Sequence, residues 1–250
     1  MQPVCDLVIP VYNEAHVLQG SVGRLAAAMT GQAGLAWRIV VVDNGSTDGT
    51  ADLGRRLAER FSYVRFLRLD AKGRGGALRA TWMQTDAAWS LYMDVDLSTA
   101  LDAVPRAIEL LGAGADIVTG SRLHPQSRIT RSIRREVLSR GYNRLIRLAL
   151  GARAFADAQC GFKGIRIETV RPLLPLVADQ DWFFDTELLV LAEMAGLSIR
   201  ELPITWTEDP DSRVNIPHTI CEDIGGLWRL RRTARRVIER WRQGRGGGEG

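Results

Sequence analysis

Two aspartates separated by one residue are the clearest candidates for chemistry in this 250-residue sequence. Asp94 and Asp96 directly follow the apolar run Leu91-Tyr92-Met93. In an extended segment, residues i and i+2 point to the same side, so both carboxylates would face one ligand. Such a pair suits a hard cation such as Mg²⁺, which keeps several waters and also binds substrate phosphates. Two solvated acids in a turn are the alternative, because an isolated Asp-x-Asp is a weak motif.

Polar residues also follow two other apolar runs. Val8–Val11 leads into Tyr12-Asn13-Glu14, and Ile39–Val42 leads into Asp43-Asn44-Gly45-Ser46. A turn between a strand and a helix explains the Asn-Gly pair, but it does not explain Asp43, which terminates a buried strand. A third segment, Lys72-Gly73-Arg74-Gly75-Gly76, opens a helical pattern, and its amides and basic side chains suit a phosphate.

The elements that must position these residues alternate regularly between strands and helices. This pattern predicts a doubly wound α/β fold, a mostly parallel sheet flanked by helices, which binds ligands at the carboxyl ends of its strands. The second half is less regular, with a basic amphipathic stretch over 133–150. We expect strands or extended segments over residues 6–11, 38–43, 64–69, 91–94, 116–120, 158–167 and 198–206. We expect helices over residues 16–29, 50–60, 75–87, 101–111 and 184–195, and a long basic helix within 217–242.

Composition excludes several classes of protein. The chain is 46% hydrophobic and 25% charged, which is typical of a globular protein. No apolar run approaches the roughly 18–20 residues of a membrane span. The N-terminus has no basic region before its first strand, so a secretory signal is not expected. The three cysteines are scattered, which excludes a disulfide scaffold and a CxxC zinc site and favours a reducing, cytosolic compartment.

Charge is segregated along the chain, although its net value is only +4. Residues 122–153 contain nine arginines and one glutamate, and residues 227–250 contain eight arginines and two glutamates. This asymmetry predicts an anionic partner: a nucleic acid, a membrane surface or a phosphorylated ligand. Residues 122–135 contain no Asp or Glu at all, and such unbalanced arginine suits bidentate binding of phosphate.

Taken in order, these segments resemble those of the family 2 glycosyltransferases, which have the GT-A fold. Motifs in the second half are similar to those of the dolichyl-phosphate β-glucosyltransferase branch, and the resemblance runs from Asp6 to about Val214. Asn44 departs from the family, which commonly has a second Asp there, and so does Ala158, where Thr is frequent. The second-half motifs are Gly120-Ser121-Arg122, Asp157-Ala158-Gln159-Cys160-Gly161-Phe162-Lys163, Phe184-Asp185-Thr186-Glu187-Leu188-Leu189, Pro203-Ile204-Thr205-Trp206 and Ser212-Arg213-Val214.

The resemblance implies a domain organisation. Residues 1–216 would form a GT-A, Rossmann-like domain, with a nucleotide-sugar-binding half at 1–121 and an acceptor-binding half at 122–216. Beyond the resemblance, the apolar spacing and the arginines predict a basic amphipathic C-terminal helix over 217–243, and the Gly-rich composition predicts a disordered tail over 244–250.

The resemblance also implies roles for individual residues. Asp94 and Asp96 would hold Mg²⁺ or Mn²⁺ on the diphosphate, and they count as catalytic together with Asp157, Asp185 and Glu187. Asp157, with Asp185 or Glu187, would orient the acceptor or the sugar, while a helix-surface acid is an equal interpretation of Glu187. The acceptor phosphate would bind Arg122, Arg128 and Arg131. The nucleotide-sugar would bind Pro10, Tyr12, Glu14, Asp43, Lys72, Arg74, Gly75, Asp94, Val95, Asp96 and Arg213.

The expected activity is a metal-dependent, inverting transfer of a hexose from a nucleotide-sugar to polyprenyl phosphate. UDP-glucose follows the nearest resemblance, while mannose and N-acetylhexosamines stay open. One rival is a soluble family 2 transferase with a carbohydrate or protein acceptor. The other is a non-catalytic nucleic-acid-binding protein, which leaves the clustered acids unexplained because carboxylates repel phosphate. We therefore expect no nucleic-acid partner. A homo-oligomer and a membrane-protein partner both stay open.

The C-terminal segment has apolar residues at near-helical spacing, interleaved with arginine. This pattern predicts an interfacial helix on an anionic membrane surface, and hence a peripheral protein on the cytoplasmic face of the cell membrane. A helix docked on the protein core or on a partner subunit is the alternative. The apolar residues are Leu227, Trp228, Leu230, Ala234, Val237, Ile238 and Trp241.

Overall fold

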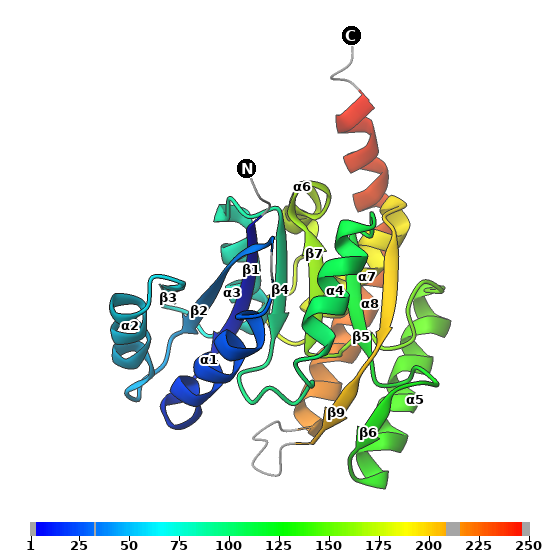
Figure 1. Cartoon of the computed structure of the whole chain (residues 1–250). Helices are drawn as coiled ribbons and strands as arrows, with labels where there is room; N and C mark the ends of the chain where they lie inside the picture. Colours follow the sequence, from blue (N-terminus) through cyan, green and yellow to red (C-terminus); the bar gives the residue numbers. More distant parts are fainter. Residues whose placement is uncertain (1–3, 33, 209–215, 247–250) are drawn as a thin grey trace.

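A seven-stranded sheet with the strand order β3-β2-β1-β4-β7-β5-β8 forms the centre of the computed structural model, which describes residues 4–32, 34–208 and 216–246 (Figure 1). All neighbouring strands are parallel except β7, which is antiparallel to both β4 and β5. The strands are β1 Val4–Val11, β2 Ala36–Asn44, β3 Val64–Leu69, β4 Trp89–Met93, β5 Ile117–Ser121, β7 Phe162–Arg166 and β8 Ile199–Pro203, and a second sheet pairs β6 Arg128–Thr130 with β9 Thr205–Thr207.

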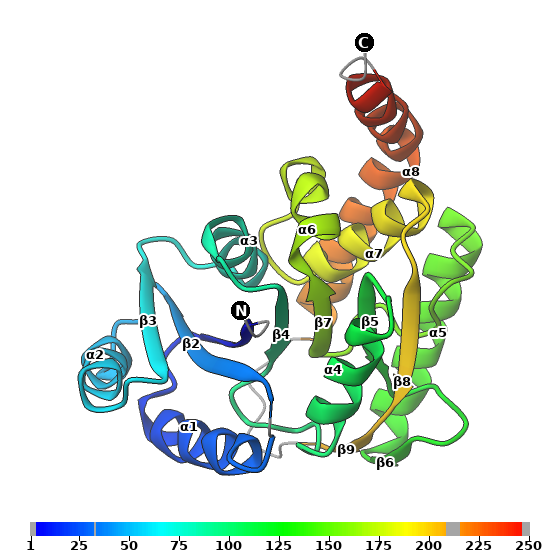
Figure 2. The same ribbon diagram turned by 45° about the horizontal axis from the view of Figure 1, so that its top comes forward.

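Helices cover both faces of the sheet. One face packs against α1, α2 and α4, and the other against α3, α6, α7 and α8 (Figure 2). The predicted α/β architecture with a mostly parallel sheet is therefore confirmed. The helices are α1 Ala15–Met29, α2 Thr50–Arg60, α3 Arg74–Gln84, α4 Ala103–Gly112, α5 Ile133–Leu150, α6 Ile167–Val170, a 3-10 helix η1 Arg171–Leu176, α7 Phe184–Ala195 and α8 Ile216–Gly246.

The central strands are apolar on both sides because both faces of the sheet are covered. Ile39 and Val41 of β2 pack into the core beneath α1 and α4, whereas Val40 and Val42 pack into the core beneath α3 and α7. An almost continuous apolar run is what such a doubly covered parallel strand requires. The same pattern in β1 places the residues that follow it at the edge of the sheet where β2 also ends.

Strand β7 is shorter than the predicted strand over 158–167, because residues 152–161 form a loop. Its antiparallel direction has a functional consequence. Phe162, at the start of β7, lies opposite Met93, at the end of β4. The loop before β7 therefore lies at the same edge as Asp94, although β7 itself runs the other way.

The apolar side of α8 packs on the protein itself. Leu227, Leu230, Ala234 and Ile238 are buried in the core that α7 also lines, and α8 packs against both α5 and α7. Gly226 permits this close approach, because a Cβ there would lie 2.5 Å from the Phe183 ring. The expectation that these four residues enter a bilayer is therefore wrong, and the alternative of a docked helix is observed. The sequence could not separate the two, because a docked helix and an interfacial helix share the same apolar spacing.

The end of α8 also corrects a boundary. The helix continues to Gly246, so the predicted disordered tail does not begin at residue 244, and residues 247–250 lie outside the described part of the chain. None of the helices within the described ranges combines the length and apolarity needed to cross a bilayer.

Two neighbouring residues of α8 give a stability test of this docking. Leu230 is 1% exposed, whereas Trp228 is 57% exposed. We expect Leu230→Ala to lower the free energy of unfolding by about 2–5 kcal/mol, because it opens a cavity in the core. The control Trp228→Ala should cost no more than about 1 kcal/mol. Urea unfolding of both variants measures the difference, and an equally small loss in both would contradict the docked helix.

Candidate functional site

The carboxyl ends of three adjacent parallel strands gather the residues that the sequence singled out. Strand β1 lies between β2 and β4, and Val11 at its end is opposite Asp43 of β2. Tyr12 and Glu14 follow β1, and Asp94 follows β4. The predicted convergence at one edge is therefore observed. Pro10 differs from the others, because it is buried within β1, opposite Val42.

Asn13 joins the loops that follow β1 and β2. Its backbone is left-handed, with φ of 58°, and its amide donates to Ser46 Oγ at 2.8 Å. Its side-chain Oδ1 accepts from the amide of Thr47 at 2.8 Å. The amide of Glu14 donates to Thr50 Oγ1 at 2.8 Å, which adds a second link. Asn13 was recognised only as part of a motif, and these contacts explain why a short, left-handed-tolerant amide occupies it.

Asp43 is fully buried, and its carboxylate has two partners in the protein. Arg68 Nη1 lies 2.7 Å from Asp43 Oδ2, and the amide of Ser46 donates to Oδ1 at 3.1 Å. Sequence reasoning did not find Arg68. The pairing of β2 with β3 would have predicted it, because Arg68 of β3 lies directly opposite Asp43 of β2 in the strand register.

Lys72 and Tyr12 lie together, with the Lys72 ammonium 4.6 Å from the centre of the Tyr12 ring. This cation–π contact places a positive charge and an aromatic face beside the end of β1. Both residues were predicted for the nucleotide-sugar, and the structure makes them neighbours.

The glycines after Lys72 are explained by packing. A Cβ at Gly73 would lie 2.7 Å from the Gln180 carbonyl oxygen, and one at Gly75 would lie 2.4 Å from Phe184 Cβ. The amide of Gly76 donates to the Gln180 carbonyl at 2.8 Å. The Gly-rich loop therefore seats the N-terminal end of α3 against the loop before α7, and the Gly76 amide is already engaged.

The Asp94-Val95-Asp96 segment forms a turn after β4 ends at Met93, so the expectation of an extended segment is wrong. Both aspartates are half-buried, while Val95 is buried between them. Asp96 accepts from the amide of Ser98 at 2.9 Å and from its hydroxyl at 2.6 Å. The turn thus fixes one carboxylate through its own backbone.

Asp94 is fixed by Arg74. The guanidinium lies 3.1 Å from Asp94 Oδ1, and its other side pairs with Asp185 of α7. Withdrawal of Asp94 from water raises the pKa of its carboxyl, Arg74 lowers it, and the charge of Asp96 adds to the rise. The site therefore holds two carboxylates close enough to influence each other, with one arginine beside them.

A buried polar network around Asp185, the second partner of Arg74, holds this carboxylate in place. Tyr92 of β4 donates its hydroxyl to Asp185 at 2.5 Å, and the Lys163 ammonium lies 3.5 Å from the same carboxylate. Lys163 also donates to the Cys160 carbonyl at 2.6 Å. Burial, followed by the charge of Asp185, raises the pKa of Tyr92, which keeps it a hydroxyl donor. Asp185, predicted to orient a substrate, has all these contacts within the protein.

Gly161 lies directly against the Asp94 carboxylate. A Cβ at this position would be 1.8 Å from Asp94 Oδ2, so no other residue fits without moving the carboxylate. The backbone also connects the two segments, since the amide of Asp94 donates to the Gly161 carbonyl at 3.2 Å. The loop before β7 therefore packs directly against the Asp94 carboxylate, and only glycine allows this close approach.

The three arginines predicted for the acceptor differ in their surroundings. Arg122 binds the fully buried Asp157 through two nitrogens, at 2.7 and 2.8 Å, and its backbone amide donates to the same carboxylate. Arg131 pairs with Glu136, whereas Arg128 is exposed on β6. Burial alone would raise the pKa of Asp157, but Arg122 holds it below its ordinary value.

Glu187 is buried, so it is not a helix-surface acid. It accepts from the amide of Asp179 at 2.9 Å and from Arg229 of α8, also at 2.9 Å. These contacts join α7 and α8 to the loop beside the Gly-rich segment. Arg213 lies outside the described residues.

The structure adds residues that the sequence did not single out for the site. The guanidinium carbon of Arg74 lies 4.5 Å from the centre of the Trp182 ring and 5.6 Å from the centre of the Tyr92 ring. Tyr92 and Lys163 belong to sequence motifs, but no role in the site was predicted for either. No sequence spacing points to this arrangement, because the three residues come from β4, β7 and the loop before α7.

Comparison with known sequences shows the family of this chain. The glycosyl transferase family 2 profile matches residues 6–172. The chain is 34% identical to glycosyltransferase AglD of Haloferax volcanii over 86% of this chain and 35% of that protein. It is 29% identical to the dolichyl-phosphate beta-glucosyltransferase of Saccharomyces cerevisiae, over 84% of this chain and 68% of the relative. It is 33% identical to the polyprenol monophosphomannose synthase of Mycolicibacterium smegmatis, over 81% of this chain and 77% of that protein.

The chain thus spans 35% of the length of glycosyltransferase AglD, 68% of the yeast relative and 77% of the mycobacterial relative. Among solved structures, glucosyl-3-phosphoglycerate synthase from Mycobacterium tuberculosis, in complex with Mn²⁺, UDP-glucose and phosphoglyceric acid, matches with a TM-score of 0.68. The match covers 92% of this chain and 79% of that one at 17% identity, which shows a shared fold.

Proposed function

This chain belongs to glycosyl transferase family 2, and on that premise we propose that it transfers a hexose from a nucleotide-sugar to a polyprenyl phosphate at a membrane surface. The observation that carries the proposal is the meeting of Asp94, Asp96 and Arg74 with Tyr12 and Lys72 at one edge of the sheet. Relatives named for dolichyl and polyprenol phosphates support the choice of acceptor.

The nucleoside would bind at the ends of β1 and β2. Tyr12 would offer an aromatic face, and Glu14 a carboxylate that accepts from base and ribose donors. Asp43 is fully buried against Arg68 and Ser46, so its carboxylate would have to move to reach such a donor. Lys72, at 4.6 Å from the Tyr12 ring, provides a cation next to the place where the diphosphate begins. UDP is the favoured nucleotide because the structural relative was solved with UDP-glucose.

Asp94 and Asp96 fit a divalent cation. Both are half-buried carboxylates in one turn, and a cation of the protein, Arg74, already lies against Asp94. Mg²⁺ needs only one or two carboxylates when substrate phosphates complete its shell, which suits a pair. The bound cation would neutralise charge on the leaving diphosphate. Mn²⁺ in the structural relative supports the same proposal.

The protein's own residues then position the reactants. Asp185 also pairs with Arg74, so it would hold the guanidinium in place if a cation occupied Asp94, and Arg74 would then be able to donate to the diphosphate. A phosphate monoester is already an anion at neutral pH, so the acceptor needs no strong general base. The acceptor would enter beside β6 and β9. Arg128 of β6 is exposed there. The amide of Thr207 of β9 donates to the carbonyl of Ser98, two residues after Asp96, which connects this small sheet to the turn of the candidate site.

A carbohydrate or protein acceptor is the second candidate. The observation that favours it is the pairing of Arg122 with Asp157 and of Arg131 with Glu136, because these ion pairs neutralise two of the three arginines assigned to the acceptor phosphate. Arg128 alone then remains exposed for that role.

A donor panel against one lipid acceptor tests the proposal. We expect the purified protein with Mg²⁺ to move radiolabel into a butanol-extractable prenyl-phosphate sugar from one of UDP-glucose, GDP-mannose and UDP-N-acetylglucosamine, with UDP-glucose the favoured donor. A prenyl alcohol of the same length, which lacks the phosphate, serves as the matched control acceptor and should give no product. Transfer from any of these donors to a free sugar or a protein, but not to the prenyl phosphate, would favour the second candidate.

A further inference from the structure

Helix α5 leaves a continuous apolar surface in solvent. Val137 is 64% exposed and Leu148 is 75% exposed, and Leu138 and Leu145 are also exposed. Figures 1 and 2 both place α5 at the outer end of the molecule, beyond β8, with no other described element on its outer side. Four large exposed apolar side chains on one helix are unusual for a surface that stays in water.

These residues share one side of the helix. Within residues 137–148, at 3.6 residues per turn, the positions of Val137, Leu148, Gly141, Leu145 and Leu138 fall in this order within an arc of about 100°. The opposite side carries Ile146 and Asn143, which are buried in the protein. The exposed arc is therefore a second apolar side of α5, separate from the one that holds the helix in the fold.

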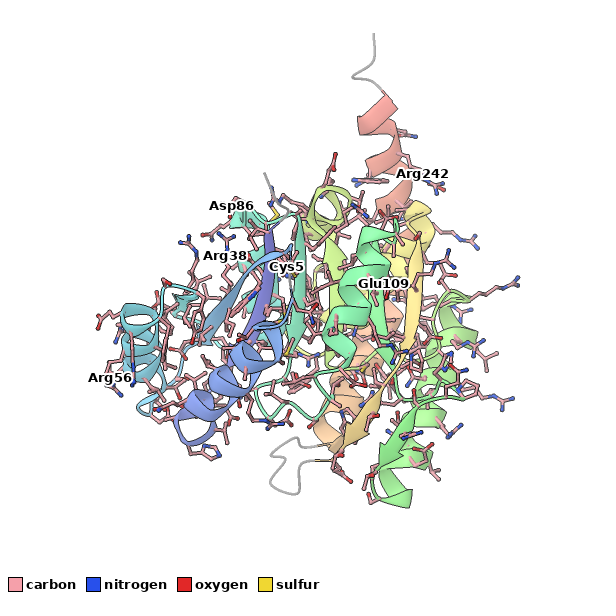
Figure 3. All side chains as sticks on the ribbon, viewed as in Figure 1. Cys5, Arg38, Arg56, Asp86, Glu109 and Arg242 are labelled. Atoms are coloured by element: carbon pink, nitrogen blue, oxygen red, sulfur yellow. The ribbon has the colours of Figure 1, made fainter. Side chains whose placement is uncertain are left out.

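Arginines occupy the arc beside the apolar one. Arg144, Arg140 and Arg147 are all exposed and fall within about 60° of one another on the same wheel. Arg140 pairs with Glu136, one turn before it. Figure 3 shows nitrogen-bearing side chains standing out from α5. An apolar strip next to a basic strip complements a bilayer with anionic headgroups, where apolar side chains enter and arginines meet phosphates.

The buried side of α5 is connected to the candidate site. Asn143 Oδ1 accepts from the amide of Ala158 at 2.9 Å, and the preceding residue, Asp157, is the one that binds Arg122. The helix also packs against α8. A membrane in contact with α5 would therefore lie close to the loop that leads into Gly161 and Asp94.

We infer that the outer face of α5, formed by Val137, Leu138, Leu145 and Leu148 with Arg144 and Arg147, docks the protein on an anionic lipid bilayer. This inference rests on the proposed function, since a lipid acceptor requires the protein to work at a membrane. It assigns to α5 the contact that the sequence pattern assigned to α8, whose apolar residues Leu227, Leu230, Ala234 and Ile238 are buried.

Vesicle flotation of the full chain tests the docking face. The vesicles contain phosphatidylcholine with 30% phosphatidylglycerol, or phosphatidylcholine alone, and neither sugar donor nor prenyl phosphate. Leu145→Gln/Leu148→Gln should lower vesicle affinity at least about tenfold per leucine. Arg144→Gln/Arg147→Gln should lower it about fivefold per arginine at low salt and remove most of the salt dependence, because each cation near the surface contributes that much.

Two controls locate the effect. Met83→Gln changes an exposed apolar residue of α3, and Trp228→Gln changes one of α8, and both should leave flotation unchanged. Thermal unfolding of each variant checks that the fold persists. Loss of flotation in Trp228→Gln with none in the α5 variants would overturn the inference. So would sedimentation showing a wild-type dimer that the leucine variant dissociates, with no vesicle binding, because a second copy would then cover α5.

The two proposals fail separately. Flotation without transfer from any donor would contradict the proposed function and leave the docking face supported. Transfer to a prenyl phosphate without flotation on anionic vesicles would contradict the docking face alone.

Discussion

Replacing Asp94 or Asp96 with alanine is expected to lower turnover at least about 100-fold while the fold persists, because removal of charge stabilisation from the leaving group has effects of this size. The two carboxylates are half-buried in a turn outside the core, and Arg74 keeps its second partner, Asp185, when Asp94 is lost. Steady-state kinetics with a nucleotide-sugar and a short prenyl phosphate, at several Mg²⁺ concentrations, measure the effect.

Asp102 provides the matched control. It is an exposed aspartate just before α4 and has no part in the proposed site. Asp102→Ala should keep wild-type turnover, and thermal unfolding should detect no collapse in any of the three variants. Near wild-type turnover in Asp94→Ala or in Asp96→Ala would refute the metal assignment.

Arg122→Ala is expected to destabilise the protein by about 3–5 kcal/mol, since removing one partner of a buried ion pair leaves an uncompensated charge. Asp157 is 0% exposed and has two guanidinium contacts within 2.8 Å. Urea unfolding measures the loss. Arg128→Ala is the control from the same segment, and we expect a change within about 0.5 kcal/mol, because Arg128 is exposed.

The pH dependence of this loss follows from the lowered pKa of Asp157. A group whose folded pKa is depressed stabilises the native state above its unfolded pKa, here about 3.8, and the contribution disappears as pH falls through the folded value. Without Arg122, burial raises the pKa of Asp157, so the variant's carboxyl protonates earlier as pH falls; the difference between wild type and Arg122→Ala should therefore be larger at neutral pH than in acid. A difference that grows toward acid would contradict the ion pair.

The first half of the fold was predictable because its strands are buried on both faces. Continuous apolar runs located β1 to β5 closely, and the predicted helix over 50–60 and strand over 64–69 coincide with α2 and β3. A parallel topology then brings the strand ends together, so Tyr12, Asp43 and Asp94 were correctly expected at one edge. Local pattern and general topology sufficed there.

Contacts between distant segments were not predictable in the same way. Residues 122–135 contain no acidic residue, yet Asp157, 35 positions after Arg122, neutralises that arginine. The antiparallel direction of β7 brings Lys163 beneath Asp185, and nothing in the local sequence fixes that direction. The support of Arg74 therefore became visible only in three dimensions.

Helices α5 and α8 show the limit of periodicity most clearly. Both sequences combine apolar residues with arginines at helical spacing, and the bounds of α5 coincide with the predicted stretch over 133–150. Periodicity indicates that a helix has an apolar side, but the rest of the fold decides whether protein covers it. Here the core near α7 covers Leu230 of α8, and Leu148 of α5 stays in solvent.

Release of nucleoside diphosphate tests the central claim most directly. The protein is incubated with UDP-glucose, with or without a short prenyl phosphate, and with Mg²⁺ or excess EDTA, and the UDP formed is measured. The account predicts UDP release that requires both the prenyl phosphate and the metal and that falls to background in Asp94→Ala. UDP release at the full rate in EDTA, or at a rate that the prenyl phosphate does not raise, would contradict it.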